Sequence, residues 1–178
     1  MMPPHCDSMD GPVVTTAKQA LDAGDVKLIL PYVPKDGEAE VIQAFEKVLP
    51  LHWQANGAKQ VADQYFFETV VRIHRAGEGA PFTGLKPAGL DVGPVIPVAE
   101  KAIETESPNE LEQLLVDIVR SEVRKRFDHM LHLKQHAQKD VDAARHYVEA
   151  MLGLQVYSHK LYLCAKAEAH EGGHEHEH

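Results

Sequence analysis

Apolar residues along most of this chain recur every three or four positions, the spacing that places them on one face of an α-helix. The spacing predicts four principal helices, at about residues 37–49, 57–76, 108–136 and 140–166. No segment shows a convincing alternation of apolar and polar residues, the pattern typical of a β-strand. We therefore expect an all-α fold: a single-domain helical bundle of about four principal helices, preceded by short N-terminal helices.

Residues that begin and end helices support this division of the chain. The expected start positions, in chain order, are Thr15 or Thr16, Asp36, Asn56, Ser107 and Asp140. The expected ends are Gly24 for the first helix and Gly77 for the helix that starts near Asn56. Shorter segments are predicted at 26–30 and 98–104. Most of these boundaries carry a residue type that physically favours the start or the end of a helix.

The segment Gly77–Pro97 contains five glycines and four prolines. This composition interrupts helices and predicts a long, ordered loop. A loop of this length inside a compact domain is often functional, and a rigid structural wrap is the alternative.

The length of 178 residues suits one hydrophobic core. We expect one domain over residues 1–166, followed by a flexible tail at 167–178 that is rich in His and Glu. Such a tail captures transition metals loosely while disordered, or it serves only to solubilise the chain.

The net charge of -9, from 27 acidic and 18 basic residues, argues against nucleic acid and anionic membranes as partners. No apolar run approaches the roughly 18 residues of a transmembrane helix, and the N-terminus lacks the pattern of a signal peptide. The sequence as it stands therefore indicates a soluble, cytoplasmic protein, or a periplasmic or secreted one if a leader has been removed. The two cysteines, Cys6 and Cys164, allow one disulfide without indicating a disulfide framework.

Histidine, with twelve residues, is the main compositional departure from an ordinary globular chain. Three long helices each place one imidazole on or near an apolar face: His74, His129 and His159. Glu122 lies two helical turns before His129 and therefore on nearly the same side of its helix. Imidazoles on separate bundle helices are a common way to build a metal site. For each histidine alone, a core residue satisfied by hydrogen bonds is the competing interpretation.

Two pairs of charged residues have the i,i+4 spacing of ion pairs on a helix. Glu68 and Arg72 lie on another side of the helix that carries His74, and in the metal hypothesis they hold the ligands in place. Glu122 and Arg126 have the same spacing, so a structural ion pair is the alternative role of Glu122.

The densest set of metal-binding side chains is the N-terminal run His5-Cys6-Asp7-Ser8-Met9-Asp10. It offers an imidazole, a thiolate, two carboxylates and a thioether. Sulfur together with imidazole suits copper, nickel or zinc better than magnesium or calcium. A frayed terminus of accidental composition is the alternative.

His5-Cys6-Asp7, followed by the turn at Gly11-Pro12, resembles the nickel hook of nickel superoxide dismutase, which also precedes a helical bundle. In that family the first histidine supplies its imidazole and the N-terminal amine, and two cysteines supply thiolates. Here residues 1–4 precede His5, and Met9-Asp10 stand near the place of the second cysteine. The resemblance implies a metal at the hook, while two of the family's nickel ligands have no counterpart.

A wider resemblance extends over nearly the whole chain. It is carried by segments 5–13, 65–81 and 83–87, which read HCDSMDGPV, YFFETVVRIHRAGEGAP and TGLKP. These segments look like those of a bacterial family of unknown function. The resemblance implies that the hook, the helix of His74 and the Gly/Pro-rich loop form one unit, and it implies no activity.

Several common motifs are absent: glycine-rich nucleotide loops, an HExxH zinc-protease helix, a GxSxG elbow and a pair of Glu-x-x-His motifs. We therefore hypothesise a helical-bundle protein that binds a transition metal ion (copper, nickel, zinc or iron). Its catalytic form would be a small redox enzyme acting on a small molecule. The expected ligands are His5 and Cys6, then His74 and His129, then His159 or Glu122. The alternatives are a non-catalytic helical interaction or stress-associated protein, and a metal carrier.

Overall fold

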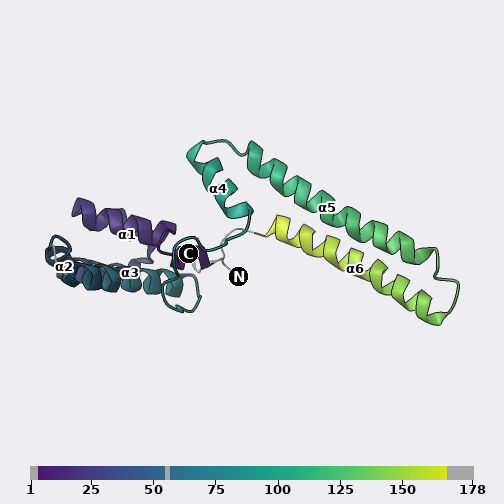
Figure 1. The fold of residues 1–178 in the computed structure, drawn as a ribbon, viewed down its shortest axis with the longest axis horizontal. Helices are drawn as coiled ribbons and strands as arrows, with labels where there is room; N and C mark the ends of the chain where they lie inside the picture. Colours follow the sequence, from purple (N-terminus) through teal and green to yellow (C-terminus); the bar gives the residue numbers. More distant parts are fainter. Residues whose placement is uncertain (1–3, 55–56, 168–178) are drawn as a thin grey trace, which may run out of the picture. The chain divides into compact units, whose positions relative to one another are not determined.

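The computed structural model describes residues 4–54 and 57–167. Within these ranges the chain forms α-helices and short 3₁₀ helices, and no strand occurs beyond one isolated parallel bridge between Ser8 and Lys86. The all-α fold predicted from the apolar spacing is confirmed. Figure 1 shows the elements, which are η1 (Pro4–Asp7), α1 (Pro12–Ala23), η2 (Val26–Leu28), η3 (Leu30–Tyr32), η4 (Lys35–Gly37), α2 (Glu38–His52), α3 (Gly57–Gly77), α4 (Val95–Glu104), α5 (Asn109–Lys134) and α6 (Val141–Lys166).

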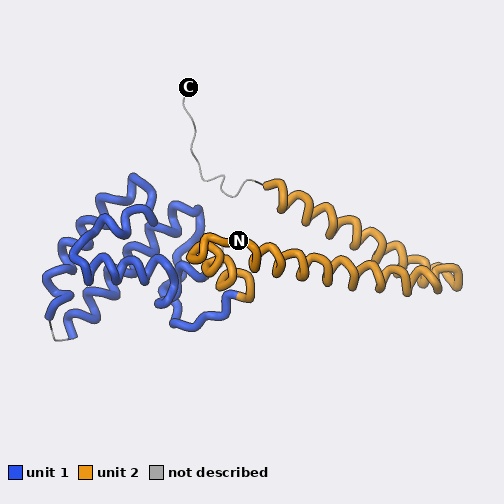
Figure 2. The backbone as a smooth tube through the Cα atoms, turned by 90° about the horizontal axis from the view of Figure 1, so that it is seen from above, with its two compact units in different colours: residues 1–92 blue, residues 93–178 orange. Residues whose placement is uncertain are grey.

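The chain divides into two compact units, residues 1–92 and 93–178, which Figure 2 colours separately. The first contains α1, α2 and α3 with the 3₁₀ helices, and the second contains α4, α5 and α6. The predicted extent of one domain, residues 1–166, spans both units and stays a prediction. The predicted tail at 167–178 falls outside the described residues apart from Ala167.

The hydrophobic core of the first unit lies where α3 packs against α1 and α2. Phe66 of α3 is fully buried at its centre, and its ring meets that of Phe45 of α2 edge to face, with 5.6 Å between centroids. From α1 the buried residues are Val13, Val14, Ala17, Ala20 and Leu21, one face of a single helix. Burial of apolar area on this scale is what stabilises a small helical unit.

A buried histidine that the sequence reasoning did not single out links all three helices of this unit. His52, at the end of α2, is 2% exposed. Its Nε2 lies 3.0 Å from Oδ1 of Asp22 on α1, and its Nδ1 lies 2.7 Å from Oδ1 of Asp63 on α3. Both ring nitrogens therefore have hydrogen-bond partners, as is usual for buried polar groups. His52 therefore acts as a structural cross-link.

The start of α1 differs from the prediction. The helix begins at Pro12 after Gly11, and not at a cap formed by Thr15 or Thr16. The reason is that the fixed φ of proline suits the first helical position, where no backbone donor is needed. The predicted end is confirmed, because Gly24 adopts the left-handed conformation (φ 64°) that closes a helix.

Two other predicted caps are wrong, and one is confirmed. Asp36 lies within η4, so that α2 begins only after Gly37. Helix α5 begins after Pro108 without a side-chain cap, so Ser107 does not serve as one. Asp140 caps α6 as predicted, because its carboxylate accepts a hydrogen bond of 2.8 Å from the backbone N–H of Ala143.

The remaining boundaries concern the Gly/Pro-rich region and its flanks. Helix α3 ends at Gly77, as predicted. The next helix, α4, begins at Val95, earlier than the predicted residue 98. Between them the chain forms the expected long loop, and Phe82 and Leu85 from this loop pack against the core. The predicted start at Asn56 lies outside the described residues.

In the second unit, α5 and α6 form an antiparallel helical hairpin (Figures 1 and 2), and α4 packs against α5. The Arg126 guanidinium of α5 stacks over the ring of Tyr157 on α6, 3.8 Å from its centroid. Among the described residues of this unit only Met130 is buried. The hairpin therefore has side-chain contacts between its helices but almost no core of its own.

Replacing Gly11 by alanine should destabilise the first unit, because a Cβ at this position would lie 1.9 Å from the carbonyl oxygen of His5. We expect G11A to lower the free energy of unfolding by about 1–3 kcal/mol, as measured by urea denaturation. The matched control is G153A in α6, where nothing lies within 4 Å of the new Cβ. That variant should be neutral or stabilising by up to about 1 kcal/mol. Equal effects of the two changes would contradict the close approach at Gly11.

Candidate metal centre

Backbone hydrogen bonds attach the N-terminal segment, residues 4–10, to the Gly/Pro-rich loop; we call this segment the hook. The N–H of Lys86 donates to the carbonyl of Asp7 at 2.8 Å, and the N–H of Met9 donates to the carbonyl of Lys86 at 3.0 Å. Further along, the N–H of Gly89 donates to Oδ2 of Asp10 at 2.7 Å. The loop thus fixes the path of the hook across the first unit.

A buried ion pair attaches the hook to α3. Nε of Arg75 donates to Oδ1 of Asp7 at 2.5 Å, and both side chains are 4% exposed. The same guanidinium donates through Nη1 to Oε2 of Glu78 at 3.0 Å. These hydrogen bonds, together with the charges of the two carboxylates, raise the pKa of Arg75, and the hydrogen bond to Asp7 is the largest cause. Arg75 therefore holds the hook and Glu78 in one fixed arrangement.

Three potential metal ligands meet beside this ion pair. They are Sγ of Cys6 from the hook, a ring nitrogen of His74 on α3 and a carboxylate oxygen of Glu78 just after α3. The three atoms lie within 4.8 Å of one another, and all three residues are half-buried. Ligand atoms at such distances need only small shifts to reach the bond lengths of a common metal ion, about 2.0–2.3 Å.

The hydrogen bonding of His74 determines which of its nitrogens faces the cluster. Nδ1 lies 2.6 Å from the backbone carbonyl oxygen of Tyr32. Because a carbonyl oxygen can only accept, Nδ1 carries a proton and donates it. In the neutral ring this leaves a lone pair on Nε2, the nitrogen that lies 3.2 Å from Oε1 of Glu78. A backbone carbonyl that fixes the tautomer in this way is typical of histidines that bind metals.

Nε2 of His74 is buried, and its contact with Glu78 lacks the geometry of a hydrogen bond. Two groups that both offer lone pairs, an imidazole nitrogen and a carboxylate oxygen, therefore face each other at short range. Buried polar atoms without a hydrogen-bond partner are rare, and each one calls for an explanation. A cation or a proton between Nε2 of His74 and Oε1 of Glu78 would explain why the two atoms lie so close together.

The environment of Cys6 favours the protonated form of its thiol. Burial raises the pKa of Cys6, and the negative charge of Glu78 raises it further, while Arg75 acts in the opposite direction. A thiol in such surroundings is a poor nucleophile. A bound cation would reverse this effect, because coordination removes the proton from a thiol.

The structure brings two of the six predicted ligands together, and the other four do not belong to the group. Cys6 and His74 belong to the cluster, and His5 is next to Cys6 in η1 without belonging to the group of three. His129 and His159 are exposed on α5 and α6 of the second unit. The last member, Glu122, also lies on α5, where its carboxylate pairs with Arg126; the ion pair lowers the pKa of Glu122.

The two residues expected to support the ligands have other partners. Glu68 accepts a hydrogen bond from Nε2 of Gln64 at 2.9 Å. Arg72 pairs with Glu40 of α2 at 2.5 Å, on the surface of the unit. The position next to the cluster belongs to Arg75, three residues further along α3.

Glu78 and Arg75 were missed by the sequence reasoning. Glu78 is four residues after His74, a spacing that joins side chains on a helix. It was overlooked because it follows Gly77, where the helix was correctly predicted to end. For Arg75 the signal was its position on the apolar side of α3, between buried Val71 and the helix end.

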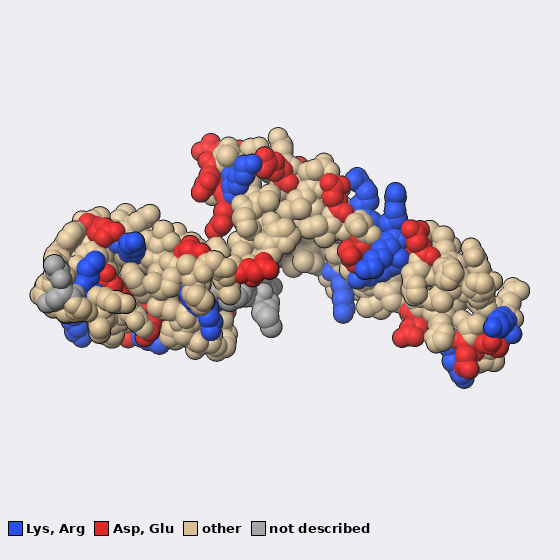
Figure 3. Space-filling view, in the orientation of Figure 1, with Lys and Arg blue, Asp and Glu red and all other residues tan. Residues whose placement is uncertain are grey.

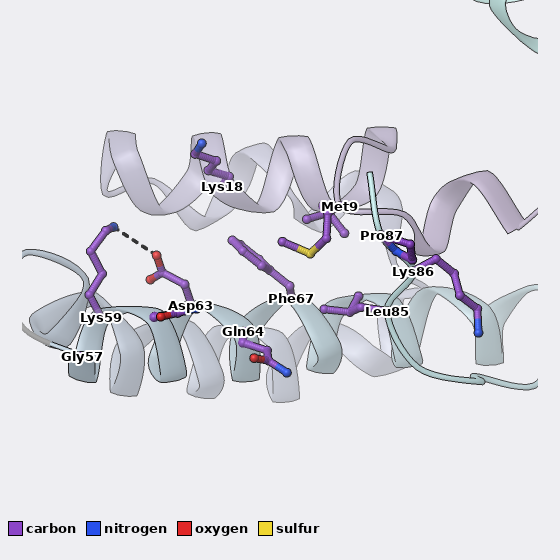
Figure 4. Close-up of a pocket in the computed structure, with 12 residues that line it drawn as sticks. Met9, Lys18, Gly57, Lys59, Asp63, Gln64, Phe67, Leu85, Lys86 and Pro87 are labelled. Carbon is purple, nitrogen blue, oxygen red and sulfur yellow. Dashed lines mark hydrogen bonds and ion pairs between the residues drawn. The ribbon is translucent and has the colours of Figure 1, made fainter. Parts of the chain in front are cut away.

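A separate cleft of about 660 Å³ lies between α1, α3 and the loop. Figure 4 shows Phe67, Met9 and Leu85 along its middle and the Lys59 side chain directed towards Asp63. Nζ of Lys59 is 3.0 Å from Oδ2 of Asp63. The hook therefore contributes to two features of the first unit: Cys6 to the cluster and Met9 to the wall of the cleft.

The described chain is all-helical, and its N-terminal hook brings Cys6 next to His74 and Glu78. The chain belongs to a family of unknown function (DUF6448), whose model matches residues 10–157. The match includes His74 and Glu78 and begins after Cys6. This finding supports the wider resemblance to an uncharacterised family, whereas nothing in the comparisons supports a relation to nickel superoxide dismutase.

No curated protein and no solved structure matches the chain. Among the residues that the structure describes, no helix is long and apolar enough to cross a membrane.

Removing the buried guanidinium should be far more costly than removing an exposed one. We expect R75M to lower the free energy of unfolding by about 3–5 kcal/mol, because Asp7 would remain buried without its partner. The control is R72M, which removes a surface ion pair with side chains 47% and 57% exposed. That variant should cost at most about 1 kcal/mol. Similar losses for both variants in chemical denaturation would show that the pair with Asp7 does not hold the hook.

Proposed function

We propose that this protein binds a single transition metal ion through Cys6, His74 and Glu78. The observation that carries the proposal is the buried Nε2 of His74, which lies 3.2 Å from Oε1 of Glu78 and has no hydrogen-bond partner. A metal ion between the two atoms would turn a repulsive contact into two bonds. The thiol of Cys6, within 4.8 Å of both, would supply a third.

The local charges also favour a divalent cation. With the thiol ionised, Cys6, Asp7 and Glu78 carry three negative charges around the single guanidinium of Arg75. A divalent ion would bring the total to zero. Uncompensated charge in a buried site is costly, so the cluster with its thiolate formed is stabilised by such an ion and destabilised without it.

Zinc is the metal that this ligand set fits best. Zinc accepts cysteine, histidine and carboxylate ligands together and has no strong geometric demand of its own. Oxygen-preferring ions such as magnesium and calcium are disfavoured by the sulfur and the imidazole. The same ligands can also bind copper, nickel or iron, and elemental analysis distinguishes these metals from zinc.

Three protein ligands leave a position at which a small molecule can bind the metal, the arrangement of catalytic rather than structural zinc sites. With zinc, this position would polarise a bound small molecule or activate water. With copper, nickel or iron, the same position would support redox chemistry on a small molecule such as superoxide or peroxide. The identity of the metal therefore decides between these reaction classes.

The test is the metal content of protein expressed in its native host and truncated after Lys166, so that the His-rich tail contributes nothing. We expect about one equivalent of one metal by plasma mass spectrometry. The variants C6S and H74A should each lose most of it, and C164S, which changes the other and exposed cysteine, should retain it. Metal-free protein that also fails to bind added zinc would overturn the proposal. In that case a proton shared by His74 and Glu78, rather than a metal ion, accounts for the close approach of Nε2 and Oε1.

Metal affinity should increase with pH, because the ion must displace a proton from Cys6, whose thiol pKa is raised by burial and by Glu78. Above the range in which histidine titrates, the zinc dissociation constant should fall about tenfold per pH unit until the raised thiol pKa is reached. Calorimetry in two buffers of different ionisation enthalpy would measure the proton released. C6S should bind zinc more weakly and release about one proton fewer. A pH-independent affinity would mean that the thiol is not a ligand.

A further inference from the structure

Helix α6 carries apolar residues on two opposite sides. One side faces α5, and its half-buried members include Tyr147, Ala150, Leu154 and Tyr157. At about 100° per residue, a second set lies on the other side of the helix. We call this second set the α6 stripe; it consists of Val141, Val148, Leu152, Val156 and Leu163.

The α6 stripe is exposed along its whole length. Its five side chains are between 43% (Val148) and 65% (Val141) exposed. Of the nineteen large hydrophobic side chains exposed among the described residues, twelve belong to α5 and α6. Apolar residues exposed along one side of a helix, here interrupted by Arg145 and His159, mark an interaction site. Helices are stabilised mainly by packing of their apolar side chains, and in the described hairpin only Met130 is buried. A binding partner for the exposed apolar residues would therefore stabilise the hairpin.

The spacing of the α6 stripe is symmetric about its middle residue. Val148 and Val156 stand four positions before and after Leu152, and Val141 and Leu163 stand eleven positions before and after it. A two-fold axis at Leu152 would place each member of the stripe opposite a member of the same stripe on another copy. Such self-complementarity is what an isologous dimer interface requires.

We propose that the α6 stripe binds the α6 stripe of a second copy of this chain, with the two helices antiparallel and Leu152 at the two-fold axis. From Val141 to Leu163 the stripe extends about 33 Å along the helix. Helices in contact over this length, with their flanking residues, bury an area on the order of 800 Å² per partner, the size of a standard interface.

The charges beside the stripe favour the antiparallel direction. Asp142 and Lys160 lie on the same edge, ten positions before and eight positions after Leu152. Antiparallel packing brings Asp142 of one copy near Lys160 of the other, whereas parallel packing would leave these two residues at opposite ends of the contact. Arg145, seven positions before Leu152 on the stripe side, is already paired with Asp142 at 2.7 Å and would lie opposite the imidazole of His159.

The surface of α5 is less suited to self-association. Lys and Arg side chains gather over its middle (Figure 3), where Arg120, Arg124 and Lys125 are exposed. A two-fold contact through this region would bring like charges together, which is destabilising. These charges therefore direct association of a second copy to α6.

The first test is the mass of the full chain in solution, measured by light scattering after size-exclusion chromatography. The wild type should have about twice the monomer mass of 19.8 kDa. L152E places two carboxylates at the axis and should weaken dimerisation at least about 100-fold, giving a monomer. The control is I103E, which makes the same change at a 78% exposed position on α4 and should remain dimeric. A monomeric wild type, or an L152E dimer of undiminished affinity, would overturn the proposal.

A second test gives the direction of the helices and does not rely on a disruptive variant. In a C6S/C164S background, V141C combined with L163C should form intermolecular disulfides readily, because positions 141 and 163 meet in the antiparallel dimer. L163C alone should not, because the two copies of this residue lie at opposite ends of the interface. Efficient cross-linking through L163C alone, or none through the pair, would contradict the antiparallel arrangement.

Discussion

The arrangement of the cluster of Cys6, His74 and Glu78 depends on the guanidinium of Arg75. The guanidinium joins Asp7 of the hook to α3 and also reaches Glu78 where the loop begins. A buried pair of this kind is retained because either charge alone would be very unfavourable. Each member of the pair adjoins a candidate ligand in the sequence: Cys6 precedes Asp7, and His74 precedes Arg75. The ion pair therefore sets the distance between the thiol and the imidazole, with or without a metal ion.

The sequence was sufficient to predict the helices and insufficient to predict what they bring together. Apolar spacing located all four principal helices because it reports burial along one face of each helix. The proximity of Cys6 to His74 depends on the path of the hook, which is fixed by backbone bonds to Lys86. Backbone bonds leave no mark in side-chain spacing. Glu78 was missed for a related reason, since its approach to His74 crosses the end of the helix.

His159 illustrates a second limit of sequence reasoning. His159 was placed correctly on an apolar face of α6. The sequence pattern alone, however, does not predict whether another helix packs against that face. In the structure that face is directed away from α5, and His159 is exposed. The two units differ in this respect: the first encloses its apolar residues around Phe66, and the second displays them. Metal binding and self-association, as proposed, would therefore reside in separate halves of the chain.

The ion pair between Asp7 and Arg75 joins residues 68 positions apart. A contact between residues so distant in the sequence forms late in folding. Closing the long loop between them costs conformational entropy before the contact can stabilise the structure. The hook also needs the loop residues Lys86 and Gly89 as backbone partners. During synthesis on the ribosome, the hook emerges before its partners and must therefore wait for almost the whole first unit. Until then the Cys6 thiol lacks the contacts that half-bury it in the folded unit, so it is more open to solvent and oxidants than in the folded protein.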